Sequence, residues 1–132
     1  CKLAGMAIRK EFTLRLQNSP GALGRVCQYL SDEKVRIEAL ALDSGGTLRI
    51  VVNNPLNAAG LLRVKQYVIE ERDVLLIQLP NETGALYKVT RLLSSAGVNI
   101  EHAYGCSPDV QPMGSVVMAV DDIERASMVA GV

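Results

Sequence analysis

Hydrophobic residues alternate with polar ones near the start of the chain and then recur at helical spacing. Phe12, Leu14 and Leu16 share one face of a period-two pattern, which predicts a half-buried strand. The segment Asn18-Ser19-Pro20-Gly21 that follows is turn chemistry able to start a helix, with Asn or Ser as its cap. The first half of the chain is then predicted to form a strand at residues 11–17, a helix with its apolar stripe between residues 23 and 30, strands at 35–43 and 47–53, a helix starting at residues 53–55, and a candidate strand at 67–70.

The second half of the chain repeats the first at an offset of 63 residues. Eleven of the 27 positions from residue 16 to residue 42 are identical in the two copies. The repeat resumes at an offset of 68, so the second copy carries five extra residues in a loop at 105–114. A period of roughly 65 residues is too long for a solenoid and suits a small duplicated domain. The predicted elements of this copy are strands at 74–79, 98–104 and 115–120, a helix at 83–96 and a helix from residue 122.

The element order in each copy is βαββαβ. It predicts an α+β fold made of two ferredoxin-like sandwiches in tandem, each an antiparallel sheet with its helices on one face. We expect the first domain at residues 8–71 and the second at residues 73–132, with their boundary in the charged segment 71–73. The second copy stops before its last strand, so its sheet is either incomplete or completed from elsewhere. We expect residues 1–5 to lie outside the fold, with Met6 as the native start.

Two turns and one strand entry carry a resemblance to a known family. They are Leu16-x-Asn18-x-Pro20-Gly21-Ala22-Leu23, its counterpart Leu79-Pro80-Asn81-x-x-Gly84-Ala85-Leu86, and Ala96-Gly97-Val98-Asn99-Ile100-Glu101. In these motifs the chain resembles a tandem ACT-domain protein over roughly residues 8–132. The resemblance implies a non-enzymatic regulatory module that binds a small amino acid or related metabolite at interfaces between ACT units. It also implies a homo-oligomer, and a regulated enzyme or regulator as partner. Thr83 in place of Pro20, and the absent last strand, depart from the pattern.

The chemistry of these turns supports binding in its own right. A helix N-terminus offers unpaired N–H groups and partial positive charge, and glycine lets a carboxylate approach that backbone. The two Asn side chains offer donors and acceptors, and carbonyls near Val35 or Val98 would accept from an ammonium group. Alternatively, Asn caps the helix and Gly relieves a tight turn, and both roles can coexist. The predicted ligand-binding residues are Asn18, Pro20, Gly21, Ala22, Leu23, Val35, Asn81, Gly84, Ala85, Leu86, Val98, Asn99 and Ile100.

Composition excludes several classes of protein. Lys plus Arg and Asp plus Glu number 14 each, and hydrophobic residues make up 48% of the chain, so a globular fold is expected and disorder is not. Nucleic-acid binding needs excess Lys and Arg, and RNA-binding sheets need exposed aromatic residues, whereas this chain has one Phe and four Tyr. No apolar run is long enough to span a membrane. Three cysteines without a CxxC motif fit reduced thiols and a cytoplasmic location.

The sequence gives little support for a catalytic site or a metal site. His102 is the only histidine, and it has no Ser, Cys or carboxylate partner at a spacing that makes a triad. His102, Cys106 and Asp109 fit no zinc pattern, and no nucleotide loop occurs, so neither a metal nor a cofactor is expected. The pair Asp121-Asp122 aligns with Asn53-Asn54 and is interpreted as a helix cap. Cys27 lies on an apolar helix stripe and is expected in the core.

Three functions therefore remain in competition. The first is the regulatory amino-acid-binding module. The second is a structural or oligomerisation module whose turns kept their chemistry without binding a ligand. The third is a small enzyme, which would need an acid–base set that one histidine and dispersed carboxylates do not supply.

Overall fold

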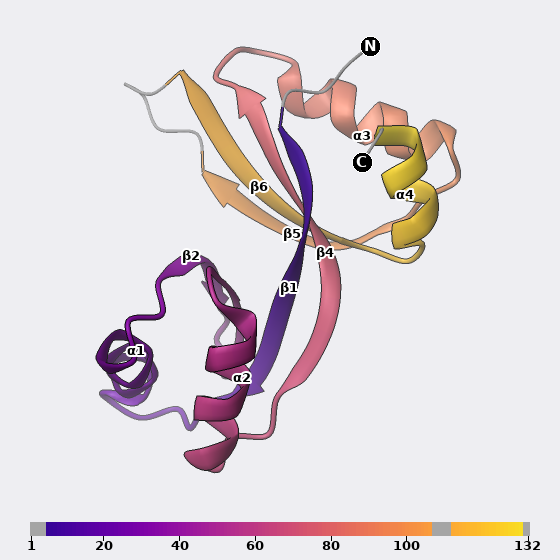
Figure 1. The fold of residues 1–132 in the computed structure, drawn as a ribbon. Helices are drawn as coiled ribbons and strands as arrows, with labels where there is room; N and C mark the ends of the chain where they lie inside the picture. Colours follow the sequence, from indigo (N-terminus) through magenta and orange to yellow (C-terminus); the bar gives the residue numbers. More distant parts are fainter. Residues whose placement is uncertain (1–4, 107–111, 131–132) are drawn as a thin grey trace. The chain divides into compact units, whose positions relative to one another are not determined.

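The computed structural model describes residues 5–106 and 112–130 and divides the chain into two compact units (Figure 1). The N-terminal unit is Lys10–Arg72. The C-terminal unit combines the residues up to Arg9 with those from Asp73 onward. The elements are β1 (Met6–Arg15), α1 (Ala22–Asp32), β2 (Ile37–Leu42), β3 (Thr47–Val52), α2 (Pro55–Val64), β4 (Glu70–Pro80), α3 (Ala85–Ser95), β5 (Ile100–Cys106), β6 (Met113–Val120) and α4 (Ile123–Ala130).

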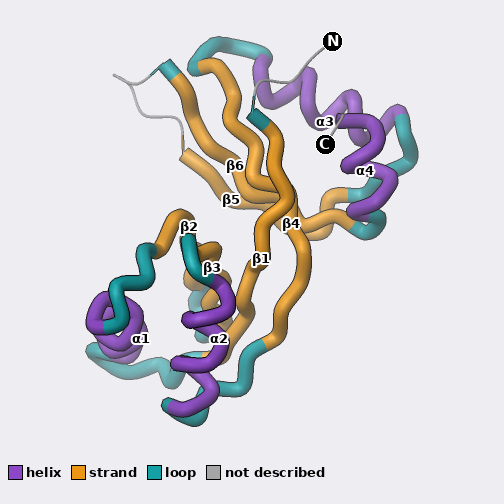
Figure 2. The backbone as a smooth tube through the Cα atoms, in the orientation of Figure 1, coloured by secondary structure: helices purple, strands orange, loops and turns teal. Residues whose placement is uncertain are grey.

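In the N-terminal unit, antiparallel strands run in the order β2-β3-β1, and α1 and α2 cover one face. Residues of period two on β1 and β3 point to that face, where they meet residues of helical period on both helices. Figure 2 shows the strand and helix segments of this unit along the backbone. The core consists of Phe12, Leu14, Leu48, Ile50 and Val52 from the strands, Val26 and Leu30 from α1, Val35, and Ala58, Ala59 and Leu62 from α2.

The C-terminal unit repeats this plan. Its antiparallel strands run in the order β5-β6-β4, and α3 and α4 pack on one face, side by side in Figure 1. Antiparallel sheets with helices on one face confirm the predicted ferredoxin-like class. The core of the unit consists of Leu75, Ile77, Leu79, Met118 and Val120 from the strands, Ala85, Val89 and Leu93 from α3, Val98, Ala126 from α4, and Met6.

The beginning of the chain contributes to the C-terminal unit. β1 is the neighbour of β4 in the strand order, and the part of β1 up to Arg9 belongs to the C-terminal unit. The N–H of Gln78 donates to the carbonyl of Gly5 at 2.8 Å, and Met6 is buried in the core of this unit. The expectation that residues 1–5 lie outside the fold is therefore wrong for Gly5, because its carbonyl pairs with the strand.

The predicted boundary segment and the predicted fourth strand also differ from the structure. Residues 71–73 lie inside β4, which runs without a break from Glu70 to Pro80, so no linker loop occurs there. Residues 67–69 form no strand, although 67–70 looked like one from its apolar residues. Tyr67 and Ile69 pack instead against the core of the N-terminal unit, which satisfies the same apolar pattern.

Asn and Asp side chains cap the helices α2 and α4, and a neighbouring Asp has a different role. At α2 the prediction is confirmed, because Asn54 is the N-cap, its side chain accepts from the N–H of Asn57 at 3.3 Å, and Pro55 opens the helix. Asp122 accepts from the N–H of Arg125 at 3.0 Å at the start of α4 in the same way. Asp121 instead accepts from the N–H of Asn99 at 2.9 Å, which joins two loops.

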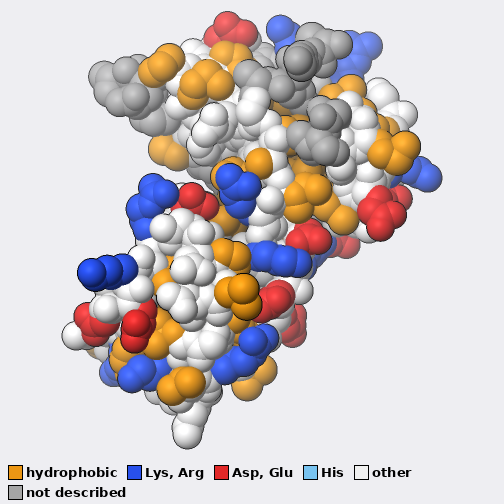
Figure 3. Space-filling view, in the orientation of Figure 1, with side chains coloured by type: hydrophobic (Ala, Val, Ile, Leu, Met, Phe, Trp, Pro, Cys, Tyr) orange, Lys and Arg blue, Asp and Glu red, His pale blue; other side chains and the backbone are white. Residues whose placement is uncertain are grey.

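The surface and the thiols agree with the sequence in part. Lys and Arg side chains lie interspersed with Asp and Glu on the face shown in Figure 3, as the balanced composition predicts. Cys27 is half-buried and Cys106 is exposed, both as free thiols, so Cys27 is less deeply buried than expected.

No helix within residues 5–106 and 112–130 is both long and apolar enough to pass through a bilayer.

Met6→Ala tests the contribution of the first strand to the C-terminal unit. Met6 is 7% exposed, so removing its side chain is expected to lower the free energy of unfolding by about 2 kcal/mol or more. Ile8→Ala is the matched control two residues along the same strand. Ile8 is 40% exposed, so its loss should cost about 0.5 kcal/mol. Equal urea midpoints for the two variants would contradict this packing.

Candidate ligand-binding site

Each first helix starts from a glycine in the left-handed region of backbone space. The N-cap of α1 is Gly21 with φ of 84°, and the N-cap of α3 is Gly84 with φ of 90°. A Cβ at either position would meet nothing within 4 Å, so backbone conformation, rather than crowding, requires glycine. The prediction that Asn or Ser caps these helices is wrong, because neither helix has a side-chain cap.

The missing cap leaves donors at the start of α3 available. The N–H of Ala85 donates to the carbonyl of Glu82 at 3.4 Å, and that of Lys88 donates to Gly84 at 3.1 Å. The N–H groups of Leu86 and Tyr87 make no hydrogen bond within the described part of the chain. These two amides add their partial positive charge to that of the helix terminus, which favours an anionic group beside them.

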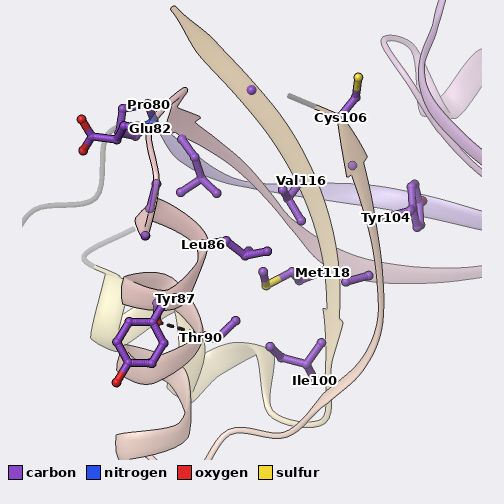
Figure 4. Close-up of a pocket in the computed structure, with 16 residues that line it drawn as sticks. Pro80, Glu82, Leu86, Tyr87, Thr90, Ile100, Tyr104, Cys106, Val116 and Met118 are labelled. Atoms are coloured by element: carbon purple, nitrogen blue, oxygen red, sulfur yellow. Dashed lines mark hydrogen bonds between the residues drawn. The ribbon is translucent and has the colours of Figure 1, made fainter. Parts of the chain in front are cut away.

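A cavity of about 570 Å³ opens beside this turn, entirely within the C-terminal unit (Figure 4). Its volume falls within the range of roughly 300–1,000 Å³ that small-molecule sites occupy. The β4–α3 turn, the first turns of α3, and the helix-facing sides of β5 and β6 form its walls. The apolar side chains of these walls are Leu79, Pro80, Ala85, Leu86, Ile100, Ala103, Val116 and Met118, and Gly84, Gly105 and Gly114 contribute backbone.

The polar side chains at the cavity leave its interior apolar. Glu82 and Tyr87 point away from it in Figure 4, and Tyr87 is 65% exposed. Thr90 donates its hydroxyl to the carbonyl of Tyr87 at 3.0 Å, so its bonding is satisfied on the helix. The ring of Tyr104 stacks on His102, with the centroids 6.3 Å apart. The cavity therefore combines two free amides at one end with an apolar body.

The equivalent place in the N-terminal unit is smaller and more polar. A cavity of about 200 Å³ there is lined by the β1–α1 turn and the β2–β3 hairpin. Leu42 and Asp43 lie on the hairpin side. The carboxylate of Asp43 already accepts from the N–H groups of Gly45 and Thr47, at 2.9 and 3.1 Å, so it serves the hairpin turn.

The structure brings some of the predicted site residues together. Gly84, Ala85, Leu86 and Ile100 line the larger cavity, and Asn18, Gly21, Ala22 and Leu23 line the smaller one. Pro20 and Asn81 line neither cavity. The N–H of Asn81 donates to the carbonyl of Pro112 at 2.8 Å, which ties the turn to the strand that follows the long loop.

Val35, Val98 and Asn99 are not brought to the turns. Val98 follows the C-terminal end of α3, and a helix of 11 residues is about 16 Å long, so Val98 lies a helix length away from Leu86. Val35 and Val98 are buried in the two cores, and the backbone of Asn99 pairs with Asp121. Val98 and Asn99 thus lie beyond the cavity, just before β5 begins, because β5 runs antiparallel to α3, whereas Ile100 lines the cavity.

Sequence reasoning missed the residues that shape the cavity. They are Leu79, Thr90, Ala103, Gly105, Val116 and Met118. The period-two pattern of β6 and the small residues at 103 and 105 were signals that could have found them. In the described part of the chain no three His, Cys, Asp or Glu residues gather as metal ligands. Asp109 and the rest of 107–111 lie outside the described residues.

One family model matches within this unit. Residues 74–128 match the model of the ACT domain, and this segment holds the uncapped turn, the cavity and both helices of the unit. The C-terminal unit is therefore similar to an ACT domain over these residues. A search of curated proteins found no match.

Solved structures share the fold over nearly the whole chain. Protein BT0572 from Bacteroides thetaiotaomicron is 29% identical, with a TM-score of 0.87, over 96% of this chain and 88% of that one. The ligand-free regulatory subunit of aspartate kinase from Thermus thermophilus is 16% identical, with a TM-score of 0.70, over 98% and 97% of the two chains. Aspartokinase III from E. coli, in complex with lysine and aspartate, is 15% identical, with a TM-score of 0.61, over 98% of this chain and 32% of that enzyme.

Gly21→Ala tests the left-handed turn. Ala at a φ of 84° is strained, so the variant should lose about 1 kcal/mol of unfolding free energy. Gly24→Ala is the matched control. It is also free of neighbours within 4 Å but lies inside α1, where Ala should add about 0.5–1 kcal/mol. Thermal unfolding of the two variants should shift in opposite directions; shifts of the same sign would refute the conformational role of Gly21.

Proposed function

We propose that this chain is a non-enzymatic regulatory module that binds a free amino acid or a closely related metabolite. The observation that carries the proposal is the uncapped start of α3, whose two free N–H groups open on a cavity of about 570 Å³ inside an ACT domain. The regulatory subunit of aspartate kinase from Thermus thermophilus shares the fold, and so does a part of E. coli aspartokinase III, whose structure contains lysine and aspartate. We extend the proposal to the N-terminal unit as a second ACT domain in tandem, on the strength of the sequence repeat.

The carboxylate and ammonium groups of a free amino acid would bind to the start of α3 and to β5, respectively. Its carboxylate would accept from the N–H groups of Leu86 and Tyr87, and charge-assisted bonds of this kind are stronger than neutral ones. Its ammonium group needs carbonyl acceptors. β5 is the outer strand of its unit in the strand order, and carbonyl groups along it beside the cavity would be these acceptors.

The proposed assembly is a homo-oligomer in which a second copy of the chain closes the site. Leu86 and Tyr87, at the edge of the cavity, are 48% and 65% exposed. A partner that covers these apolar side chains would remove their surface from water, which would stabilise the closed site. Binding at an interface between ACT units also supplies a mechanism of regulation, since a ligand that fits one arrangement better than another shifts the population toward it. The regulated partner would be an enzyme or another regulator.

A ligand-free interaction module is the second candidate. Leu40 and Leu42 on β2 are 44% and 43% exposed, and β2 is the outer strand of its unit. Exposed leucines on an outer strand favour contact with another chain whether or not a ligand is present.

A panel of the twenty amino acids tests the proposal against this alternative. A ligand at 100 times its dissociation constant should add about 2.7 kcal/mol to the unfolding free energy and raise Tm. Calorimetric titration then gives the stoichiometry. If none of the twenty changes Tm or releases heat, the binding function is refuted and the interaction module remains.

Tyr87→Pro tests the role of the free amides. It removes one N–H in the first turn, where proline is tolerated, and the Tyr87 side chain points away from the cavity. The dissociation constant of the amino acid should rise about tenfold or more. Tyr87→Ala loses the same ring but keeps the N–H, and it should bind as the parent protein does. Equal affinities of the two variants would exclude the amide as a contact.

A further inference from the structure

The two units differ in two residues that face the helix side of their outer strands. Leu40 and Leu42 in the first copy correspond to Ala103 and Gly105 in the second at the offset of 63. The pairing of the strands gives the same correspondence, since Leu42 lies opposite Leu48 and Gly105 lies opposite Val116, which are related by the offset of 68. Large side chains thus stand in one unit where small ones stand in the other.

These differences match the difference in cavity size. Leu42 lines the cavity of about 200 Å³, whereas Ala103 and Gly105 line the one of about 570 Å³. A Cβ at Gly105 would lie 2.5 Å from the carbonyl oxygen of Ser115, so the close approach of β6 excludes any side chain at this position. Glycine at position 105 is therefore required by the packing of β5 against β6.

The body of the larger cavity offers no partner to a charge. Glu82 is the single charged residue among the described residues that line it, and its carboxylate points away in Figure 4. The hydroxyl of Thr90 is used by the helix. Apolar faces of Leu86, Ile100, Val116 and Met118 remain. A charged ligand side chain there would lose its hydration without compensation, whereas an apolar one would gain from burial.

We infer that the C-terminal unit selects amino acids with a large apolar side chain, such as phenylalanine, leucine or methionine, and that Ala103 and Gly105 determine this selectivity. The inference rests on the proposed function, because it assumes that the carboxylate is held by the start of α3. It assigns no such site to the N-terminal unit, where Leu42 lines a cavity of only about 200 Å³.

Titration calorimetry of the full chain with single amino acids tests the selectivity. L-phenylalanine, L-leucine and L-methionine should bind at least about tenfold more tightly than L-lysine, L-aspartate and L-threonine. Tighter binding of any member of the second group would overturn the inference and leave the proposed function standing. The absence of binding by all six and by the remaining amino acids would overturn both.

Ala103→Leu gives the second unit the residue that the first unit has at the equivalent position, Leu40. The larger side chain would occupy part of the cavity and narrow the space for a ligand's apolar side chain, so the affinity for L-phenylalanine should fall at least about tenfold. Ala103 is exposed, and Leu occupies the matching place in the other unit, so the strand is expected to accept it. Leu40→Ala is the matched control and should leave the affinity unchanged. If Leu40→Ala lowers the affinity and Ala103→Leu does not, the ligand binds to the N-terminal unit and the inference is wrong.

A measurement on the unmutated chain locates the ligand independently. Met118 lines the cavity and is 1% exposed, whereas Met128 on α4 is 81% exposed and lines no described cavity. In methyl NMR spectra, saturating L-phenylalanine should shift the Met118 signal through its ring current and leave Met128 in place. A bound amino acid that moves neither methyl, or only Met128, would overturn the assignment to this cavity.

Discussion

A left-handed glycine at the start of the first helix is the constraint on which each site depends. Gly21 and Gly84 let the chain turn from strand to helix with a φ of 84° and 90° and with no side-chain cap. A capping Asn or Ser would have used the first-turn amides internally. Because the turn is made by backbone conformation alone, those amides stay available, and their position relative to the outer strand is set by the core beneath.

The same core explains why the first residues of the chain matter. In the C-terminal unit, β5, β6 and most of β4 come from the residues from Asp73 onward, and the start of β1 joins them. Met6 brings a buried side chain and Gly5 a backbone acceptor to β4. β1 therefore contributes to two cores, since Phe12 and Leu14 belong to the other one. Stability of the C-terminal unit is thus linked to residues far from it in sequence.

Much of the fold was predictable because two periods are explicit in the chain. Alternation at Phe12, Leu14 and Leu16 gave the strand, and the repeat then fixed the order of the elements twice. The site was predicted only in part. Local turn signals located Gly84 and Leu86, but Ala103 and Met118 reach the cavity through strand pairing and carry no motif of their own. The hydrogen bond between Gly5 and Gln78 of β4 is also a long-range contact, which the periodicity of the sequence does not predict.

The divergence of the two copies bears on what the cavity is for. Protein interiors are close-packed, and an empty apolar space loses dispersion contacts that neighbouring side chains would otherwise make. In the first copy, Leu42 lines the equivalent cavity, whose volume is about 200 Å³. In the second copy, Gly105 stands at the position of Leu42, and the close approach of β6 leaves no room for a side chain there. The two copies therefore differ here by backbone packing as well as by side-chain size, and under the proposed function an apolar ligand side chain would supply contacts to the walls of the larger cavity.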